Sequence, residues 1–292
     1  MAERRWGHAL EAMGARLAFG FLRLLPLDRA SALGGAIGRA IGPRIGASKR
    51  AVINLHRAMP ELGERDVERI VTGMWDNLGR VVAEFPHLGE IRVFESGGRV
   101  ELIGAEAVLA ARAAGRRIIF FSAHFGNWEI AAQAATQAGF PVVLVYRAAN
   151  NPFIDRLIVE ARTPASGDLV PKGPATARRL VAAMRRGDSL CMLVDQKMND
   201  GIPVPFFGRD AMTAPALARL ARRFDCLVVP ARVERLEGAH FRLVLEAPLE
   251  VPHGADPHAD DLALMTAVNA TIERWVRADP ARWFWIHRRW PD

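Results

Sequence analysis

The spacing of apolar residues along the chain changes near residue 100. Before that point apolar residues recur every three or four positions, as at Ile70, Met74 and Leu78, and this spacing predicts helices between residues 45 and 90. After it, short continuous apolar runs alternate with helical segments. We expect strands at 117–122, 141–146, 190–194, 227–233 and 241–245, and helices at 105–114, 127–138, 152–162, 175–186, 213–224 and 260–277.

This alternation predicts the α/β class, with a central, mostly parallel or mixed sheet flanked by helices. Continuous apolar runs such as 142–145 are typical of strands that are buried on both faces. The sequence contains no internal repeat and no clear linker. We therefore expect a single α/β domain over 46–292, preceded by a helical segment over 1–45.

The apolar residues of the N-terminal segment recur at helical spacing, so that they share one face. They are Leu10, Met13, Leu17, Phe21 and Leu24. The segment has no run of 18 uncharged apolar residues, because Arg23 interrupts its most apolar part. We expect a helix that associates with a membrane surface through apolar burial and attraction to anionic lipid. The alternative is a core helix packed on the body.

Charge is concentrated in the same region. The chain of 292 residues carries 39 basic and 32 acidic side chains, a formal charge of +7. Nine basic and three acidic residues lie within residues 1–50, so this segment holds +6 of that charge. A basic, apolar segment before a nearly neutral body favours a membrane surface or an acidic partner over nucleic acid. Only three of the basic residues of the chain are lysines. A general compositional bias accounts for this preference for arginine, but not for the concentration of basic residues within residues 1–50.

The two cysteines, Cys191 and Cys226, each lie in a short apolar run and are expected to be buried as small hydrophobic residues. Two isolated cysteines give neither a disulfide framework nor a metal-binding spacing. Their use is typical of a reducing compartment that faces the cytosol.

The most informative segment for chemistry is His124-Phe125-Gly126-Asn127-Trp128-Glu129, between an expected strand and an expected helix. Ligands of such sheets bind at the carboxyl ends of the strands, where His124 would lie. A carboxylate in the first helical turn, such as Glu129, can hold one imidazole nitrogen and raise the basicity of the other. The alternative is a capping or core histidine.

Other motifs are missing from the sequence. There is no G-x-S-x-G, no cysteine at a strand-to-helix turn and no H-E-x-x-H, so neither a protein nucleophile nor a metal site is evident. A histidine and carboxylate without their own nucleophile suit direct deprotonation of a substrate hydroxyl. The remaining histidines show no comparable context: His8, His56, His87, His240, His253, His258 and His287.

The H-x4-E pattern of His124 and Glu129 resembles the H-x4-D/E motif of glycerolipid acyltransferases. In the form H-F-G-N-W-E it is similar to the lipid A biosynthesis lauroyl/myristoyl acyltransferase family, the late acyltransferases of lipopolysaccharide assembly. Further similar blocks follow in order: Y-R-A-A-N-N-P at 146–152, D-Q and V-P-F-F-G within 195–208, V-P at 229–230 and P-A-R-W-F-W-I-H-R-R-W at 280–290. The resemblance spans nearly the whole chain.

The resemblance implies an acyltransferase in which His124 is the general base and Glu129 orients it. The implied donor is a thioester of acyl carrier protein, and the implied acceptor is a hydroxyl of a lipid A precursor, a phosphorylated glucosamine disaccharide with hydroxyacyl chains. No cofactor or metal is expected. The implied location is the cytoplasmic face of the inner membrane.

Further residues are candidates for binding substrate. They are Arg147, Asn127, Asp195 and Gln196. The planar fork of Arg147 suits a phosphate, with an ion pair to a nearby carboxylate as the alternative. Asp195 and Gln196 suit sugar hydroxyls or a contact with Arg147, and the alternative is a structural role in the loop. Lys172 and Lys197 are weaker candidates for phosphate contacts.

The C-terminal region is rich in tryptophan. Four of the seven tryptophans are Trp275, Trp283, Trp285 and Trp290, and arginines lie between them. This composition suits either a membrane interface or a segment docked on the sheet, with the rings in the core.

Two alternative functions remain open at the level of sequence. One is an acyltransferase that acts on another glycolipid, such as a phosphatidylinositol mannoside. The other is a membrane adaptor that keeps the fold without catalysis, although the pair His124 and Glu129 argues against it.

Overall fold

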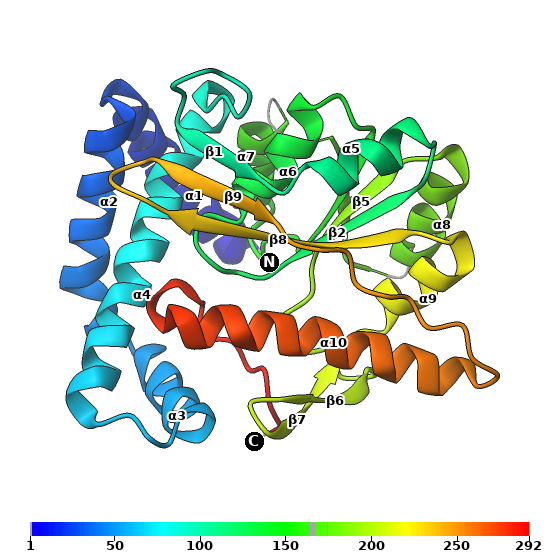
Figure 1. Cartoon of the computed structure of the whole chain (residues 1–292). Helices are drawn as coiled ribbons and strands as arrows, with labels where there is room; N and C mark the ends of the chain where they lie inside the picture. Colours follow the sequence, from blue (N-terminus) through cyan, green and yellow to red (C-terminus); the bar gives the residue numbers. More distant parts are fainter. Residues whose placement is uncertain (1, 164–166, 174, 292) are drawn as a thin grey trace.

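A seven-stranded sheet forms the centre of the molecule, in the order β1-β9-β8-β2-β5-β3-β4 (Figure 1). The computed structural model describes residues 2–163, 167–173 and 175–291. The strands of the sheet are β1 (Val100–Ile103), β2 (Ile118–Ser122), β3 (Val142–Tyr146), β4 (Asp168–Pro171), β5 (Ser189–Leu193), β8 (Leu227–Arg235) and β9 (Phe241–Leu245). A separate antiparallel hairpin consists of β6 (Ile202–Phe206) and β7 (Arg209–Thr213).

All pairs in the sheet are parallel except β8 with β9, so the expectation of a mostly parallel or mixed sheet is confirmed. The five expected strands are present. The sequence pattern did not predict β1, β4 or the β6–β7 hairpin. Because β2 pairs with β5, Ser122 lies opposite Leu193. The residues that follow these two strands therefore meet at one edge of the sheet.

Helices cover both faces of the sheet. Those of the body are α5 (Glu106–Ala113), α6 (Glu129–Gln137), α7 (Pro152–Arg162), α8 (Thr176–Arg186), α9 (Ala216–Phe224) and α10 (Pro257–Ala278). In β2, Ile118 and Phe120 belong to the core with α5 and α6, whereas Ile119 and Phe121 belong to the core with α8, α9 and α10. Every residue of β2 is buried, as its continuous apolar run predicted.

The N-terminal region folds into four helices: α1 (Ala2–Leu24), α2 (Leu27–Ile41), α3 (Ser48–Ala58) and α4 (Glu64–Glu84). Helix α2 packs closely on α4, where a Cβ atom on Gly34 would lie 2.2 Å from the carbonyl oxygen of Gly79. Glycine is required for this approach of the two backbones. Helix α2 is thus part of the folded body.

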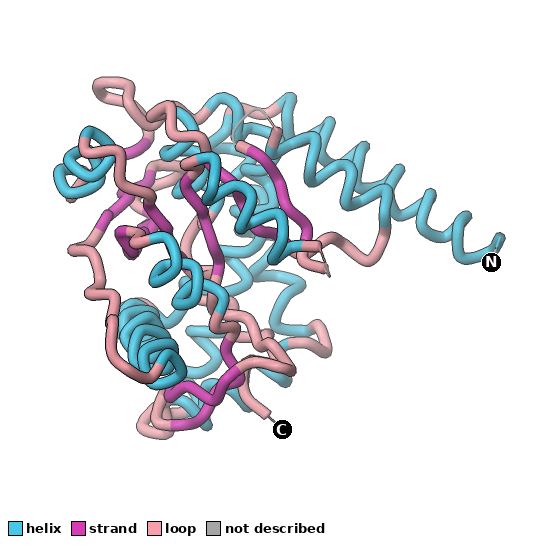
Figure 2. Tube along the Cα trace, turned by 90° about the vertical axis from the view of Figure 1, so that its right-hand side faces the viewer, coloured by secondary structure: helices cyan, strands magenta, loops and turns pink. Residues whose placement is uncertain are grey.

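Helix α1 projects away from the rest of the molecule toward the N-terminus (Figure 2). The exposed apolar residues on it are the ones at helical spacing: Leu10, Met13, Leu17, Phe21 and Leu24. Its other side contacts the body, and Phe19 stacks on Phe85. Within the part of the chain that the structure describes, no helix has the length and apolar character needed to cross a membrane.

The C-terminal tryptophans lie in the core, so the docked-segment interpretation is confirmed for these side chains. Trp275, Trp283, Trp285 and Trp290 are all buried. Trp290 stacks on Phe206 of the β6–β7 hairpin, with ring centroids 5.5 Å apart. Both cysteines are buried and unpaired, as expected.

Candidate active site

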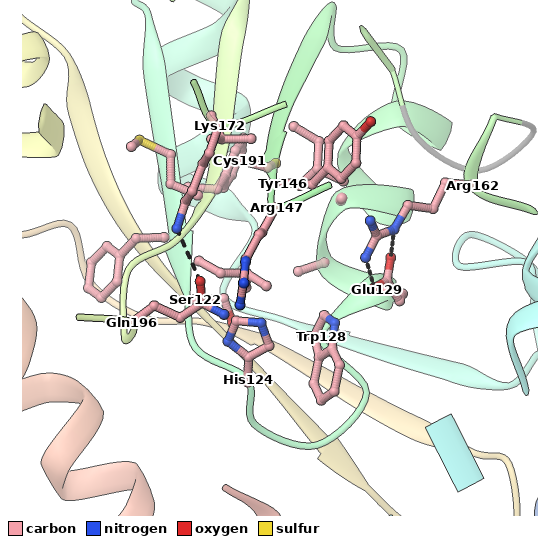
Figure 3. Close-up of a pocket in the computed structure, with 18 of the residues that line it drawn as sticks. Ser122, His124, Trp128, Glu129, Tyr146, Arg147, Arg162, Lys172, Cys191 and Gln196 are labelled. Carbon is pink, nitrogen blue, oxygen red and sulfur yellow. Dashed lines mark hydrogen bonds and ion pairs between the residues drawn. The ribbon is translucent and has the colours of Figure 1, made fainter. Parts of the chain in front are cut away.

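A cavity of about 350 Å³ opens at the carboxyl ends of β2, β3 and β5 (Figure 3). Its polar lining includes Ser122, His124, Glu129, Tyr146, Arg147, Arg162, Lys172 and Gln196. Its deeper wall is apolar and includes Phe120, Ala131, Leu144 and Cys191. The cavity therefore joins an ionic mouth to an apolar interior.

His124 lies on a tight turn that the C-terminal segment holds in place. Gly126 has a φ of +58°, and a Cβ atom there would lie 2.1 Å from the carbonyl oxygen of Val233. The Gly126 amide donates to the carbonyl oxygen of Arg282, and the Phe284 amide donates to that of His124, each at 3.1 Å. The segment at 282–284 thus pairs with the turn that carries His124.

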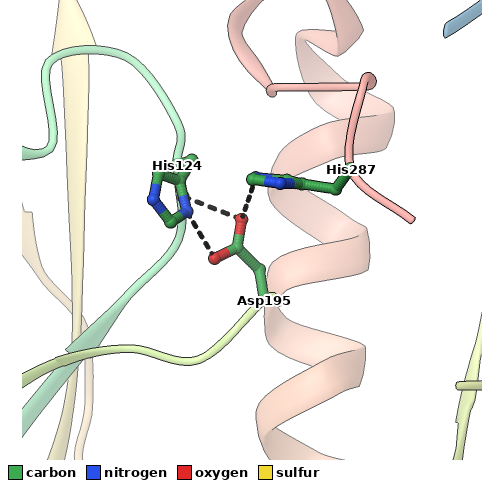
Figure 4. Close-up of side chains that lie close together, drawn as sticks. All are labelled: His124, Asp195 and His287. Atoms are coloured by element: carbon green, nitrogen blue, oxygen red, sulfur yellow. Dashed lines mark hydrogen bonds and ion pairs between the residues drawn. The ribbon is translucent and has the colours of Figure 1, made fainter. Parts of the chain in front are cut away.

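The side chain of Asp195 orients His124 (Figure 4). The Nδ1 atom of His124 lies 2.8 Å from Oδ1 of Asp195, and the His124 amide donates to Oδ2 at 2.9 Å. The indole Nε1 of Trp283 also donates to Oδ2, at 2.8 Å. Because an ionised carboxylate only accepts, Nδ1 carries the proton in the neutral form of the ring, which leaves the lone pair on Nε2.

Asp195 is ionised in this arrangement. It is 1% exposed, and burial alone would raise its pKa. The charge and hydrogen bonds of His124, together with His287, outweigh burial and hold the pKa of Asp195 well below its usual range. An ionised Asp195 favours the protonated, imidazolium form of the adjacent His124 ring.

A second histidine, His287, packs against the first. The ring centroids of His124 and His287 are 4.8 Å apart, and Nε2 of His287 lies 4.0 Å from Oδ2 of Asp195. Burial, reinforced by the charge on His124, lowers the pKa of His287 to about 3, so it is neutral near pH 7. Its Nε2 is buried, and no hydrogen bond reaches it from the residues that the structure describes.

His124, Asp195 and His287 also have the donor types of a metal site, and their ligand atoms all lie within 4.8 Å of one another. A metal ion between them would have to displace the 2.8 Å hydrogen bond of the first two residues. Their observed geometry is that of a hydrogen-bonded acid-base pair.

Glu129 lines the same cavity, but its partner differs from the expected one. Both of its carboxylate oxygens accept from Arg162, at 2.6 and 2.9 Å (Figure 3). Burial would lower the pKa of Arg162, but the adjacent Glu129 carboxylate raises it. The orienting contact that we expected from Glu129 is made by Asp195, and Glu129 instead forms a buried ion pair in the cavity wall.

Asn127 is fully buried and does not line the cavity. Its Nδ2 donates to Glu84 at 2.8 Å, and its Oδ1 accepts from the Glu129 amide at 3.2 Å. These contacts fix the start of α6. Asn127 therefore has a structural role at the start of α6, and the expected contact with substrate is not supported.

Arg147, Lys172 and Gln196 lie at the mouth of the cavity, whereas Lys197 is exposed and does not line it. Arg147 is exposed there, and Nζ of Lys172 donates to Oε1 of Gln196 at 3.2 Å. Partial burial lowers the pKa of Lys172, and the charge of Arg147 lowers it further, although Asp195 opposes both. Two crowded cations at one opening are typical of a site for an anionic group.

Two further groups in the cavity bear on the reaction type. Burial raises the pKa of the Cys191 thiol to about 12, so it is protonated and unreactive. The Ser122 hydroxyl is buried and makes no hydrogen bond to His124 or to any other residue that the structure describes. An oriented imidazole without an activated nucleophile beside it suits general base catalysis, in which the ring acts directly on a substrate group.

Comparisons with known proteins agree with this class. The family model for bacterial lipid A biosynthesis acyltransferases matches residues 5–292. The chain belongs to this family and is an acyltransferase of lipid A biosynthesis. The predicted family resemblance is therefore confirmed, and the family implies a glycolipid acceptor.

Individual relatives are similar at modest identity. The lipid A biosynthesis lauroyltransferase of Escherichia coli K12 is 25% identical over 247 residues, which cover 81% of this chain and 76% of that protein. A lipid A biosynthesis acyltransferase of Haemophilus influenzae is 26% identical over 91% of this chain and 82% of its own length. The E. coli lipid A biosynthesis myristoyltransferase is 26% identical over 86% of this chain and 77% of its own length.

Proposed function

We propose that the protein transfers a fatty acyl chain from acyl carrier protein to a hydroxyl of a lipid A precursor. The observation that carries the proposal is the pair of His124 and Asp195, joined at 2.8 Å in a cavity with an ionic mouth and an apolar interior. The apolar wall suits an acyl chain, and the mouth suits a phosphorylated substrate. Two relatives are named as a lauroyltransferase and a myristoyltransferase, and these names support a fatty acyl chain as the transferred group.

In the proposed mechanism His124 acts as the general base. Its Nε2 takes the proton of the acceptor hydroxyl while the hydroxyl oxygen attacks the thioester carbonyl. The tetrahedral intermediate then collapses, the carbon–sulfur bond breaks, and the imidazolium returns the proton to the leaving thiolate. Asp195 holds the ring in the required tautomer and stabilises its positive charge throughout. The reaction balances without a metal or a cofactor.

The mouth residues Arg147, Lys172 and Gln196 are proposed to bind the phosphates and hydroxyls of the substrates. Guanidinium and ammonium groups recognise phosphate, and an amide recognises a sugar hydroxyl. The buried pair of Glu129 and Arg162 then shapes the cavity wall next to the reacting atoms.

We further propose that α1 attaches the enzyme to the cytoplasmic face of the inner membrane. Five large apolar residues on this helix are exposed, and Leu24 is 84% exposed. Arg16 lies on the same helix, where its charge would meet anionic headgroups. An amphipathic helix of this kind lies in the headgroup region without crossing the bilayer.

Mass spectrometry of lipid A from a deletion strain tests the function. The expected result is lipid A that lacks one acyl chain, restored by the wild-type gene but not by the His124→Ala variant. Lipid A that is unchanged in the deletion strain would refute the proposed acceptor. If the His124→Ala protein, folded and membrane-bound, restored the chain, the proposed base would be wrong.

A further inference from the structure

Helix α8 has an unusual distribution of charge. It carries four arginines and no acidic residue: Arg178, Arg179, Arg185 and Arg186. Its apolar residues Leu180, Ala183 and Met184 are buried against the body. All four arginines are exposed, so the solvent face of the helix is strongly basic.

Two of these arginines are not neutralised by neighbouring acids. Arg179 lies 3.5 Å from Asp168, and Arg186 lies 2.5 Å from Asp188. Within the described part of the chain, by contrast, no carboxylate forms an ion pair with Arg178 or Arg185. These two residues are seven positions apart and therefore share one face of the helix. Arg178 and Arg185 therefore leave this face of the helix with uncompensated positive charge.

The basic face leads directly to the catalytic cavity. Strand β4 ends at Pro171, and Lys172, the next residue, lies at the cavity mouth near Arg147. Helix α8 begins four residues later at Thr176 and is about 16 Å long, from 11 residues at 1.5 Å each. Positive charge thus extends from the mouth along α8, whose place beside the sheet is seen in Figure 1.

The same face lacks the features of a lipid-binding surface. None of the large apolar residues that the structure shows as exposed lies on α8, whereas five of them lie on α1. Apart from the arginines, the exposed residues of the helix are Ala177 and Ala182. A basic surface without large apolar side chains suits recognition of an acidic protein helix by complementary charge.

We propose that the exposed face of α8, with Arg178 and Arg185 at its centre, is the docking surface for an acidic helix of the protein that carries the acyl thioester. This inference rests on the proposed function, because it assumes a protein-bound donor. The carrier would then present its prosthetic arm to the cavity between Arg147 and Lys172, whose charges would meet the phosphate of that arm. Docking on α8 leaves α1 free for the lipid that holds the acceptor.

The test compares two donors in the double variant Arg178→Glu/Arg185→Glu. One donor is lauroyl-acyl carrier protein, and the other is lauroyl-pantetheine, which lacks the acidic protein. We expect kcat/KM with the carrier to fall about tenfold, mainly through KM, because surface charges act chiefly on association. With lauroyl-pantetheine, the kcat/KM of the variant should stay within about twofold of wild type. Its kcat at saturating carrier should also stay within about twofold.

A matched variant controls for net charge. Arg65 and Arg92 are also exposed and lie outside α8, so Arg65→Glu/Arg92→Glu makes the same change in total charge elsewhere. This control should keep its kcat/KM with the carrier within about twofold of wild type. An equal loss in both double variants would show general steering by net charge and would overturn the docking surface.

Other outcomes separate this inference from the proposed function. If the α8 variant kept wild-type kinetics with the carrier but bound anionic vesicles less well, α8 would be a membrane surface and the inference would be wrong. Equal losses with both donors would indicate a damaged active site and would also refute docking. If wild-type enzyme used lauroyl-pantetheine but not the carrier thioester, the proposed donor itself would fail.

Discussion

The Nδ1 atom of His124 lies 2.8 Å from Oδ1 of Asp195, although the two residues are 71 positions apart in the chain. The same carboxylate accepts from the His124 amide and from the Trp283 indole. These contacts fix both the tautomer and the direction of the ring. Asp195 is therefore the residue whose removal should affect the chemistry most directly after His124 itself.

For Asp195→Asn we expect kcat to fall by about a hundredfold or more, with little change in KM, because the amide neither stabilises the imidazolium nor fixes its tautomer. Steady-state kinetics with varied acceptor checks this. Asp200 is exposed in the loop that follows, so Asp200→Asn is the matched control and should retain activity. An Asp195→Asn enzyme within about threefold of wild type would contradict the orienting role.

Glu129→Gln should destabilise the protein by about 3 kcal/mol, because it leaves the largely buried Arg162 without its carboxylate. Urea denaturation measures this loss. We also expect Glu129→Gln to lower kcat, because the unpaired Arg162 disturbs the cavity wall. The double variant Glu129→Gln/Arg162→Met removes both charges, and we expect it to regain much of the lost stability and activity. If the double variant is stable but its kcat stays as low as that of Glu129→Gln, Glu129 acts on the reaction itself, as the sequence motif suggested.

Trp283→Phe should lower kcat about tenfold by removing one donor from Asp195 while keeping an aromatic ring in the core. Trp285 is equally buried, but its indole donates to the carbonyl oxygen of Pro280. Trp285→Phe thus controls for the loss of one buried tryptophan. The prediction requires that the two variants have similar stability but different kcat, and equal kcat values would count against it.

His287 should make stability depend on pH. Its pKa is about 3 in the folded protein and 6.5 in the unfolded chain, so the unfolded chain binds more protons between these values. The contribution of the neutral His287 ring to the free energy of unfolding is complete above pH 6.5. As the pH drops from 6.5 toward 3, this contribution falls by up to about 1.4 kcal/mol per pH unit. His287→Phe should remove this slope from the free energy of unfolding.

Urea denaturation of wild type and His287→Phe at pH 7, 6, 5 and 4 gives the difference between the two proteins. Other groups that titrate in this range cancel in that difference. His253 is exposed, and its variant His253→Phe should follow the wild-type pH dependence. Parallel curves for wild type and His287→Phe would show that His287 is not held neutral.

The fold was largely predictable because its strands are continuous apolar runs and its helices have regular apolar spacing. Helix α7 has the expected bounds, and so does β9. The β6–β7 hairpin was missed because Pro203 and Pro205 break the usual signal of a strand. The edge strands β1 and β4 contain only four residues each, which is too short for a clear apolar run.

The active site was predictable only in part. The motif located His124, and the rule that ligands bind at strand ends drew attention to Asp195. The sequence did not reveal that β5 lies next to β2, so nothing connected the two residues before the fold was known. His287 was hidden for the same reason, because the docking of the C-terminal segment brings it to His124. Glu129 was assigned by its distance in sequence, whereas Arg162, 33 positions away, is its partner.

The pairing of residues 282–284 with the turn that carries His124 has a consequence for the order in which the enzyme folds during synthesis. Phe284 and Trp283 can contact His124 and Asp195 only after synthesis has passed residue 284. Helix α1 leaves the ribosome well before the residues that hold His124 in place. If α1 attaches to lipid as we propose, a growing chain could attach before its active site is complete.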